Sequence, residues 1–288
     1  MGYDLFFKTK SNNFSKLEFE KYFKARKNYT LDNNQAWYEN NKTGVYFAFE
    51  FNEGDSNEYS DEHYQCSFNI NYFRPSFFAL EAEPELSNFV NNFGMTINAP
   101  QIDGMKNGVY SSSGFLTGWN KGNEFGYESI INQAGEVYTL PTAKLEESWK
   151  WNYEKDALQN SVSEDVFVPK IIFVKLSKKV VTACVWPDAV PSILPEVDIL
   201  LIQRKKLAIR KIFTKKEDVA IGSWIEFIPL ISKYSKKTIN NSSYVFYDEV
   251  PIDIVKAVKN LPSTSIEELE VISPENILNE ELVCKCIY

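Results

Sequence analysis

Hydrophobic and polar residues alternate in two segments of the first half of the chain. Apolar residues take every second position in residues 45–51, and the same spacing recurs in residues 64–72. Successive side chains of a strand point to opposite faces, so this alternation predicts an antiparallel sheet with one wet side. Residues 3–8 read as another strand of the same half.

Capping residues predict the helices of this half. Ser15 followed by Glu18 forms a capping box, so we expect a helix from Lys16 to Lys27. Pro84 at a start position and Gly94 beyond the end bracket a predicted helix over residues 85–93.

A longer helix is predicted over residues 114–133. It contains Gly118, Gly122 and Gly126, and each glycine costs about 1 kcal/mol relative to alanine. Either close packing or a ligand that contacts the helix offsets that cost, and close packing is the commoner cause.

The second half consists of short apolar runs rather than alternating ones. Strands are predicted over residues 166–176, 180–186, 197–203 and 207–213, with helices over 224–234 and 252–260 and a last strand over 282–288. Strands and helices mix without a regular βαβ rhythm. The predicted fold class is therefore α+β, with an N-terminal antiparallel sheet and a strand-rich C-terminal unit.

Composition changes near residue 151. Residues 1–151 hold 31 of the 43 aromatic residues, with 20 acidic and 13 basic residues, whereas residues 152–288 carry 19 acidic and 18 basic ones. We therefore predict two α+β domains, an acidic and aromatic-rich one over 1–151 and an Ile/Val/Leu-rich one over 152–288.

The whole composition excludes several classes. A hydrophobic content of 44% is too high for disorder, and a net charge of -8 argues against a nucleic-acid partner. The sequence contains no run of about 18 apolar residues, so it predicts no membrane span, and the N-terminus lacks the features of a secretory signal. Four cysteines form no disulfide or zinc pattern. We expect a cytoplasmic protein with no cofactor and no membrane partner.

Catalytic motifs are missing from the sequence. His63 is the only histidine, which excludes a site with several histidine ligands, and we predict no metal site. The chain contains neither a G-x-S-x-G nucleophile motif nor a phosphate-binding glycine loop. We therefore predict no catalytic residue and favour a protein that is not an enzyme.

An acidic segment lies between the two alternating runs. Six carboxylates and no basic residue lie between Lys42 and Arg74. Such a segment steers a basic partner electrostatically, although a solvated hairpin connection is the commoner outcome. The candidate binding residues are Glu53, Asp55, Glu58, Tyr59, Asp61, Glu62 and Tyr64.

A second set of polar residues would suit a charged pocket. Two carboxylates follow an arginine at the approach to a helix, and a polar ladder follows on the glycine-rich helix. Acidic residues that complement a helix N-terminus explain much of this pattern equally well. The residues of this alternative site are Arg74, Glu81, Glu83, Asn120, Asn123, Glu124 and Tyr127.

A basic run lies in the second half. Arg204 to Lys216 contains seven basic residues with Ile and Leu between them, which reads as a strand pair with a basic outer face. This half has nearly balanced charge, so we expect at most a local anion or partner contact there.

Three segments carry a resemblance to known proteins. Residues 72–90, 114–127 and 166–198 resemble a family of uncharacterised bacterial cytosolic proteins, and this resemblance covers most of the chain. The aromatic-rich, acidic character also resembles immunity-type proteins that neutralise polymorphic toxins. Neither resemblance implies an activity or the role of any residue.

Two functions follow as expectations. The first is a non-enzymatic cytosolic protein-binding module, of the immunity-inhibitor type, that occludes a basic surface of a partner protein. The alternative is an enzyme or a small-molecule-binding protein with a polar cleft between the two halves.

Overall fold

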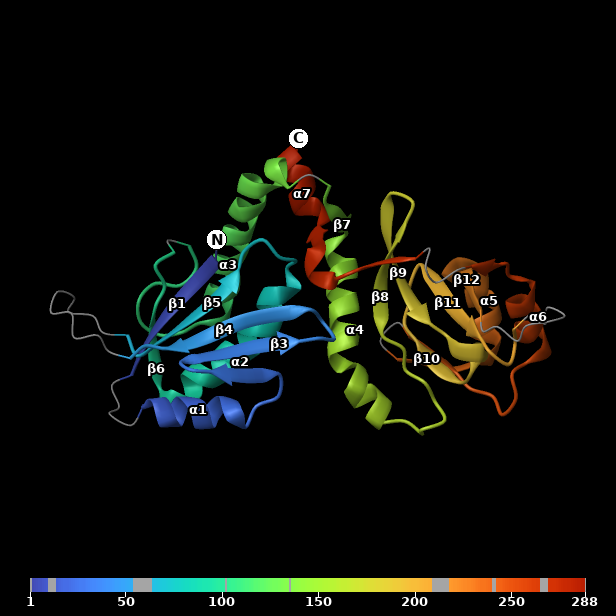
Figure 1. The fold of residues 1–288 in the computed structure, drawn as a ribbon, viewed down its shortest axis with the longest axis horizontal. Helices are drawn as coiled ribbons and strands as arrows, with labels where there is room; N and C mark the ends of the chain where they lie inside the picture. The colour runs from blue at the N-terminus through green and yellow to red at the C-terminus, as the bar shows by residue number, and fades with distance from the viewer. Residues whose placement is uncertain are drawn as a thin grey trace. The chain divides into compact units, whose positions relative to one another are not determined.

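Figure 1 shows the computed structural model of the chain, which describes residues 2–9, 14–53, 64–101, 103–134, 136–208, 218–239, 242–264 and 269–287. The fold is α+β, which confirms the predicted class. The chain divides into two compact units, which we call the first and the second unit. The first comprises Met1–Glu146 and Glu275–Tyr288, and the second comprises Glu147–Pro274.

This division differs from the predicted one in two respects. It falls at residues 146/147 rather than 151/152, inside helix α4 (Thr142–Asn160), and the last fourteen residues return to the first unit. The first unit therefore carries 22 acidic and 13 basic residues, and the second carries 17 and 18. The sequence does not show the apolar periodicity of a helix over α4, because its buried positions are mostly polar, namely Leu145, Ser148 and Asn152.

The first unit is built on a six-stranded antiparallel sheet. Its strands lie in the order β2-β3-β4-β5-β1-β6. Their bounds are β1 (Gly2–Thr9), β2 (Tyr29–Asp32), β3 (Gln35–Asn40), β4 (Val45–Phe51), β5 (Cys66–Asn71) and β6 (Met95–Asn98). Both alternating segments of the sequence thus lie in central strands, as the period-two pattern predicts.

Three helices cover one face of this sheet, which we call the inner face. They are α1 (Lys16–Lys24), α2 (Phe77–Phe93) and α3 (Ser112–Ile130). The ring centroids of Phe23 and Phe89 lie 5.0 Å and 4.8 Å from that of Phe49 on β4. Phe115 of α3 reaches Phe68 on β5. An aromatic core between helices and sheet accounts for the aromatic surplus of this half.

Two of these helices differ from the predicted bounds. The capping box at Ser15 is present, but α1 ends at Lys24. Helix α2 begins at Phe77, so Pro84 lies inside it rather than at its start. A proline removes a single backbone hydrogen bond, and burial of Phe77, Phe78 and Ala82 holds the preceding turns in the helix.

The glycines of α3 allow close packing, which confirms the commoner interpretation. A Cβ atom on Gly118 would lie 2.7 Å from the backbone oxygen of Asp103, and one on Gly122 would overlap the ring of Tyr72. Side chains at these positions would push the helix away from the sheet.

The second unit contains a mixed six-stranded sheet in the order β15-β12-β11-β9-β8-β16. All its neighbouring strands are antiparallel except β9 and β11, which are parallel. The bounds are β8 (Ile171–Leu176), β9 (Lys179–Val185), β11 (Ile199–Arg204), β12 (Asp218–Ser223), β15 (Ser263–Thr264) and β16 (Glu270–Ile272). A three-stranded sheet joins it, formed by β10 (Ser192–Leu194), β14 (Ser242–Val245) and β13 (Ser235–Ile239).

Helices α5 (Trp224–Tyr234) and α6 (Ile252–Asn260) have the predicted bounds. Their residues Phe227 and Ile254 share one apolar cluster with Leu200 of β11. The predicted strand over 207–213 lies largely outside the described residues, and β12 is the antiparallel neighbour of β11.

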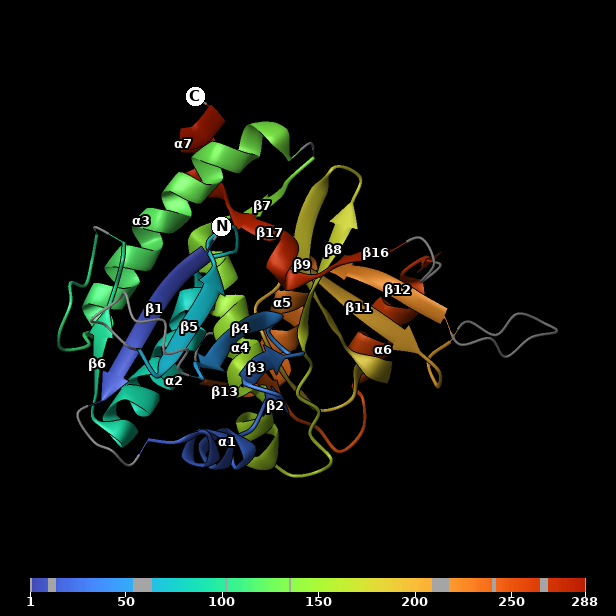
Figure 2. The same cartoon turned by 60° about the vertical axis from the view of Figure 1, so that its left-hand side comes forward.

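The predicted last strand over 282–288 is wrong. Residues Glu280–Ile287 form helix α7, which follows a short strand, β17 (Ile277–Asn279). Strand β17 pairs in parallel with β7 (Tyr138–Leu140), and α7 lies beside α3 in Figures 1 and 2. Val283 is buried in the cluster that contains Tyr127, which favours a helix here. No helix in the described part of the chain is long and apolar enough to cross a membrane.

Candidate functional site

The face of the first sheet opposite to α1, α2 and α3 is the candidate site, and we call it the outer face. One row of side chains crosses it from β2 to β1, namely Thr30, Trp37, Ala48, Asn69 and Asp4. The next row along the strands is Asp32, Gln35, Glu50, Ser67, Phe6 and Asn98. These side chains are half-buried or exposed, in contrast to those of the inner face.

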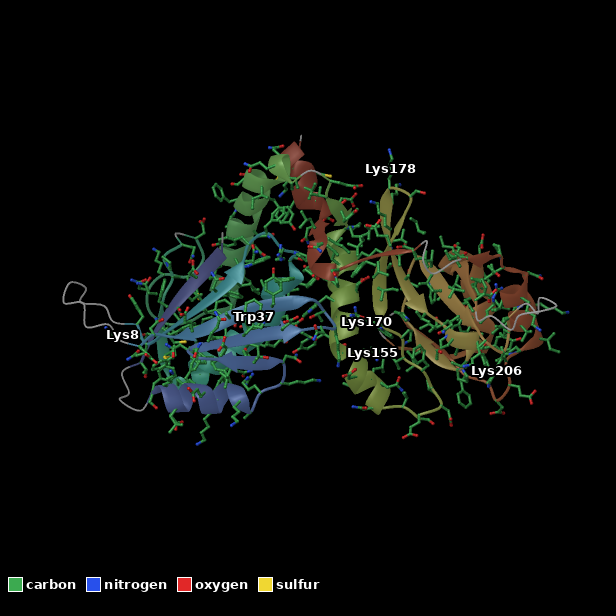
Figure 3. All side chains as sticks on the ribbon, viewed as in Figure 1. Lys8, Trp37, Lys155, Lys170, Lys178 and Lys206 are labelled. Carbon is green, nitrogen blue, oxygen red and sulfur yellow. The ribbon has the colours of Figure 1, made fainter. Side chains whose placement is uncertain are left out.

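Two aromatic pairs lie on the outer face. Trp37 of β3, which Figure 3 labels, stacks on Tyr46 of β4 with ring centroids 5.5 Å apart and planes 17° apart. Arg74 lies over the ring of Tyr46 and donates a hydrogen bond of 2.7 Å to its hydroxyl oxygen. Towards the other edge, Phe6 contacts Tyr64 at 5.7 Å. Aromatic rings fixed by such contacts present large contact areas at little entropic cost.

Acidic side chains predominate on the strands of this face. Four carboxylates and one amine project from it, namely Asp4, Asp32, Glu39, Glu50 and Lys8. Glu39 accepts a hydrogen bond of 3.2 Å from the Trp37 indole, and Asp4 accepts one of 2.6 Å from the Asn69 amide. These bonds hold acidic groups beside the aromatic rings, where a cation of a partner would meet both.

The predicted acidic segment connects the two central strands, β4 and β5. Five of its candidate residues lie outside the described residues, namely Asp55, Glu58, Tyr59, Asp61 and Glu62. Glu53 is exposed and forms an ion pair of 2.8 Å with Lys16, whose hydrogen bond and charge lower the pKa of that carboxyl. Tyr64 belongs to the outer face, since it contacts Phe6 and its hydroxyl accepts a hydrogen bond from Asn98.

Helix α2 directs Glu81 and Glu83 to different partners. Glu81 is buried and accepts hydrogen bonds of 2.8 Å from the Tyr38 hydroxyl and 2.7 Å from the Asn40 amide, both on β3. Glu83 instead accepts hydrogen bonds from Ser87 and Tyr110. Residues two apart lie about 200° apart around a helix, so the two carboxylates form no pair.

Three of the other alternative residues do meet. Asn123 is buried, and its amide donates to the backbone oxygens of Tyr72 and Arg74. The Tyr127 hydroxyl donates to the same Arg74 oxygen at 3.2 Å. These bonds fix the turn between β5 and α2, and they use the backbone of Arg74 while its guanidinium lies over Tyr46.

The last two alternative residues, Asn120 and Glu124, are not part of that cluster. Asn120 is exposed. Glu124 lies 3.3 Å from Lys121 and 3.5 Å from Lys285, and their hydrogen bonds and charges lower its pKa. All seven residues of the alternative site belong to the first unit.

Sequence reasoning missed a buried network around Asn279. Its side chain accepts from the backbone N–H of Ser76 at 2.8 Å, and donates to the hydroxyls of Ser76 and Thr142 at 2.9 Å and 3.0 Å. Its backbone N–H donates to the Tyr127 hydroxyl. The sequence indicated this network only through Asn279, a polar residue that directly follows the apolar residues Ile277 and Leu278. Each of these bonds joins parts of the first unit, so the network is a scaffold.

Arg204 is buried, which corrects its assignment to a basic outer strand face. Its guanidinium donates twice to the carboxylate of Asp218, at 2.8 Å and 2.7 Å. It also donates to the backbone oxygens of Val258 and Leu261 and to Ser263. All five N–H donors are satisfied, so Arg204 clamps the end of α6 to the sheet. Residues 209–217 of the basic run lie outside the described residues.

Comparison of the chain with protein-family models, curated proteins and solved structures found no match. Within the described ranges, no three His, Cys, Asp or Glu side chains are grouped so that they could hold a metal ion. The outer face is therefore the feature on which a functional proposal rests.

Proposed function

We propose that the chain is a cytoplasmic, non-enzymatic protein-binding module whose outer face docks a basic surface of another protein. It acts by occluding that surface, as an immunity-type inhibitor would. The observation that carries this proposal is the composition of the outer face: its strands present four carboxylates and one lysine, and the same face holds the Trp37–Tyr46 stack with Arg74 over Tyr46.

In the proposed binding, charged and aromatic side chains have different roles. Carboxylates raise the encounter rate with a basic partner and disfavour acidic ones. Partly buried Trp and Tyr rings then provide the contact area that holds the complex. The acidic segment between β4 and β5 adds carboxylates next to the same two strands in the chain.

The alternative, a polar-cleft enzyme or small-molecule-binding protein, is not our proposal. The polar atoms of Glu81, Asn123 and Tyr127 form hydrogen bonds within the first unit. Asn123 and Tyr127 hold the backbone at Arg74, and Glu81 is bonded to side chains of β3, so these groups serve the internal packing of the unit.

Charge reversal on the outer face tests the proposal. The full chain is used to capture partners from its host at low and moderate salt, and a captured basic protein is purified and titrated. We expect Glu39→Lys/Glu50→Lys to weaken its binding at least tenfold. Glu128→Lys/Glu280→Lys changes the net charge equally at exposed positions on α3 and α7 of the first unit, and serves as the control. Equal loss in both variants, or in neither, would contradict the proposal.

A further inference from the structure

We infer that the element received by the outer face is a basic amphipathic α-helix of the partner, which lies along β4 and β5. This inference rests on the proposed function and names the partner's docking element. The spacing of large and small side chains across the sheet carries it.

Small side chains lie between the two aromatic pairs. Ala48 on β4 and Ser67 and Asn69 on β5 are the shorter side chains at the centre of the outer face, with Trp37 on the β3 side and Phe6 on the β1 side. Along β4, Tyr46 and Glu50 lie at the two ends of this centre. Strands lie about 4.8 Å apart, so β3 and β1 are separated by about 14 Å. A helix with its side chains is about 10–12 Å wide, so a single helix fits between the aromatic pairs.

A strand is a poorer occupant of this position. Extended peptides bind sheets by adding to an edge, where backbone groups have no partner. Both β4 and β5 are internal and pair on both sides, so the outer face offers side chains alone. The inner face of the same sheet is covered by helices, which is how an apolar or mixed sheet face is generally covered.

The charges define the sequence of the helix. Asp4 lies on the β1 side of the small side chains, Glu39 on the β3 side and Glu50 beside Ala48 on β4. One cation, Arg74, lies over Tyr46 at the opposite end of β4 from Glu50. Basic residues are therefore expected on both flanks of a narrow strip of small or apolar residues. Tyr46 to Glu50 spans about 13 Å along β4, which corresponds to about nine residues of helix. The partner helix thus presents two to three turns with apolar residues spaced i, i+3/i+4, i+7.

Peptide display on the full chain tests this inference. Random 16-residue peptides are selected on the wild-type chain and counter-selected on Ala48→Arg/Ser67→Arg, which fills the centre of the outer face. Trp37→Ala serves as a second variant that removes an aromatic side without adding bulk or charge. Circular dichroism melts show that each variant is folded before it is used.

We expect face-dependent peptides to be basic with helical apolar spacing, and a central proline in a synthesised peptide to weaken binding at least tenfold. Basic peptides without that spacing and insensitive to the proline would overturn the helix but leave the proposed function standing. Acidic peptides, or none that depend on the face, would overturn both. A dimer of the chain that Ala48→Arg dissociates in sedimentation would assign the face to a second copy and also overturn the inference.

Discussion

The two six-stranded sheets of this protein use their faces differently. In the first unit, buried Phe47 and Phe49 alternate with half-buried Tyr46 and Ala48 along β4, so one face is dry and the other is wet. In the second unit, consecutive residues of β11 are buried, from Ile199 to Ile202. Leu200 and Ile202 belong to the cluster with α5 and α6, whereas Ile199 and Leu201 belong to a separate cluster with Val174 and Ala183.

This difference explains where charge gathers. A sheet with an apolar cluster on each face leaves few strand positions for carboxylates, and in the second sheet these are Asp218 and Glu270, each the first residue of its strand. The second unit has nearly balanced charge. The first sheet devotes alternate positions of every strand to the outer face, and acidic residues occupy several of them. Four of the 22 acidic residues of the first unit thus lie on the strands of the outer face, whereas the inward positions of these strands carry none.

The largest expected difference between the two sheets is in their tolerance of a lysine at an alanine position. Ala183→Lys in β9 places an amine in an apolar cluster and is expected to destabilise the second unit by about 4 kcal/mol. Ala48→Lys in β4 points to the outer face and should change stability by less than about 0.5 kcal/mol. Urea unfolding with hydrogen exchange in each unit measures both, and similar losses would show that the outer face is not wet.

The second-largest expected loss of stability follows from removal of a buried charge. Among the described residues, Arg204 is the buried charged side chain of the second unit. Arg204→Ala removes the donors that bind Asp218 and the carbonyl groups of Val258 in α6 and of Leu261 just after it. We expect a loss of about 3 kcal/mol, confined to the second unit. Exposed Lys206 provides the control, and Lys206→Ala should have little effect on urea unfolding. A small effect of Arg204→Ala would mean that the clamp is dispensable.

The scaffold of the first unit should respond separately. Asn279→Ala removes hydrogen bonds to Ser76 and Thr142 and is expected to cost about 2 kcal/mol. Faster hydrogen exchange should appear in α3 and β7, and β9 and β11 should stay protected. Asn276→Ala, an exposed asparagine three residues earlier, is the matched control. Faster exchange in β9 or β11 would contradict the assignment of this segment to the first unit.

The smallest expected effect concerns the N-terminus of α4, the helix whose residues include the boundary between the two units in sequence. Partial burial raises the pKa of Glu281, but hydrogen bonds to its carboxylate, among them those from Thr142, lower it by more. The pKa therefore lies below its ordinary value. The ionised form is therefore favoured by folding, and its contribution is lost as pH falls below about 4.3. Glu281→Gln should cost about 0.5 kcal/mol at neutral pH and nothing at low pH. Glu280→Gln is the control, and a difference that persists at pH 3 would contradict this cap.

Local patterns predicted much of the fold because they depend on neighbours in the chain. Alternation over residues 45–51 and 64–72 located the central strands and the wet side, and α5 and α6 have the bounds expected from the sequence. Of the candidate binding residues, Tyr64 belongs to the outer face, while the Trp37–Tyr46 stack was missed. That stack depends on the register between β3 and β4, which no single strand encodes.

The amino-acid sequence by itself determined that this protein is α+β, that its first half is acidic and that this half contains a sheet with one wet side. These properties follow from periodicity and composition, which act over a few residues. Only the tertiary structure decided that residues 275–288 complete the first unit and that Asn279 meets Ser76, more than 200 positions away. It also decided that Arg204 is buried, because the partners that satisfy its donors come from β12, α6 and β15. Such long-range pairings depend on how elements pack, and packing is not written in any one segment.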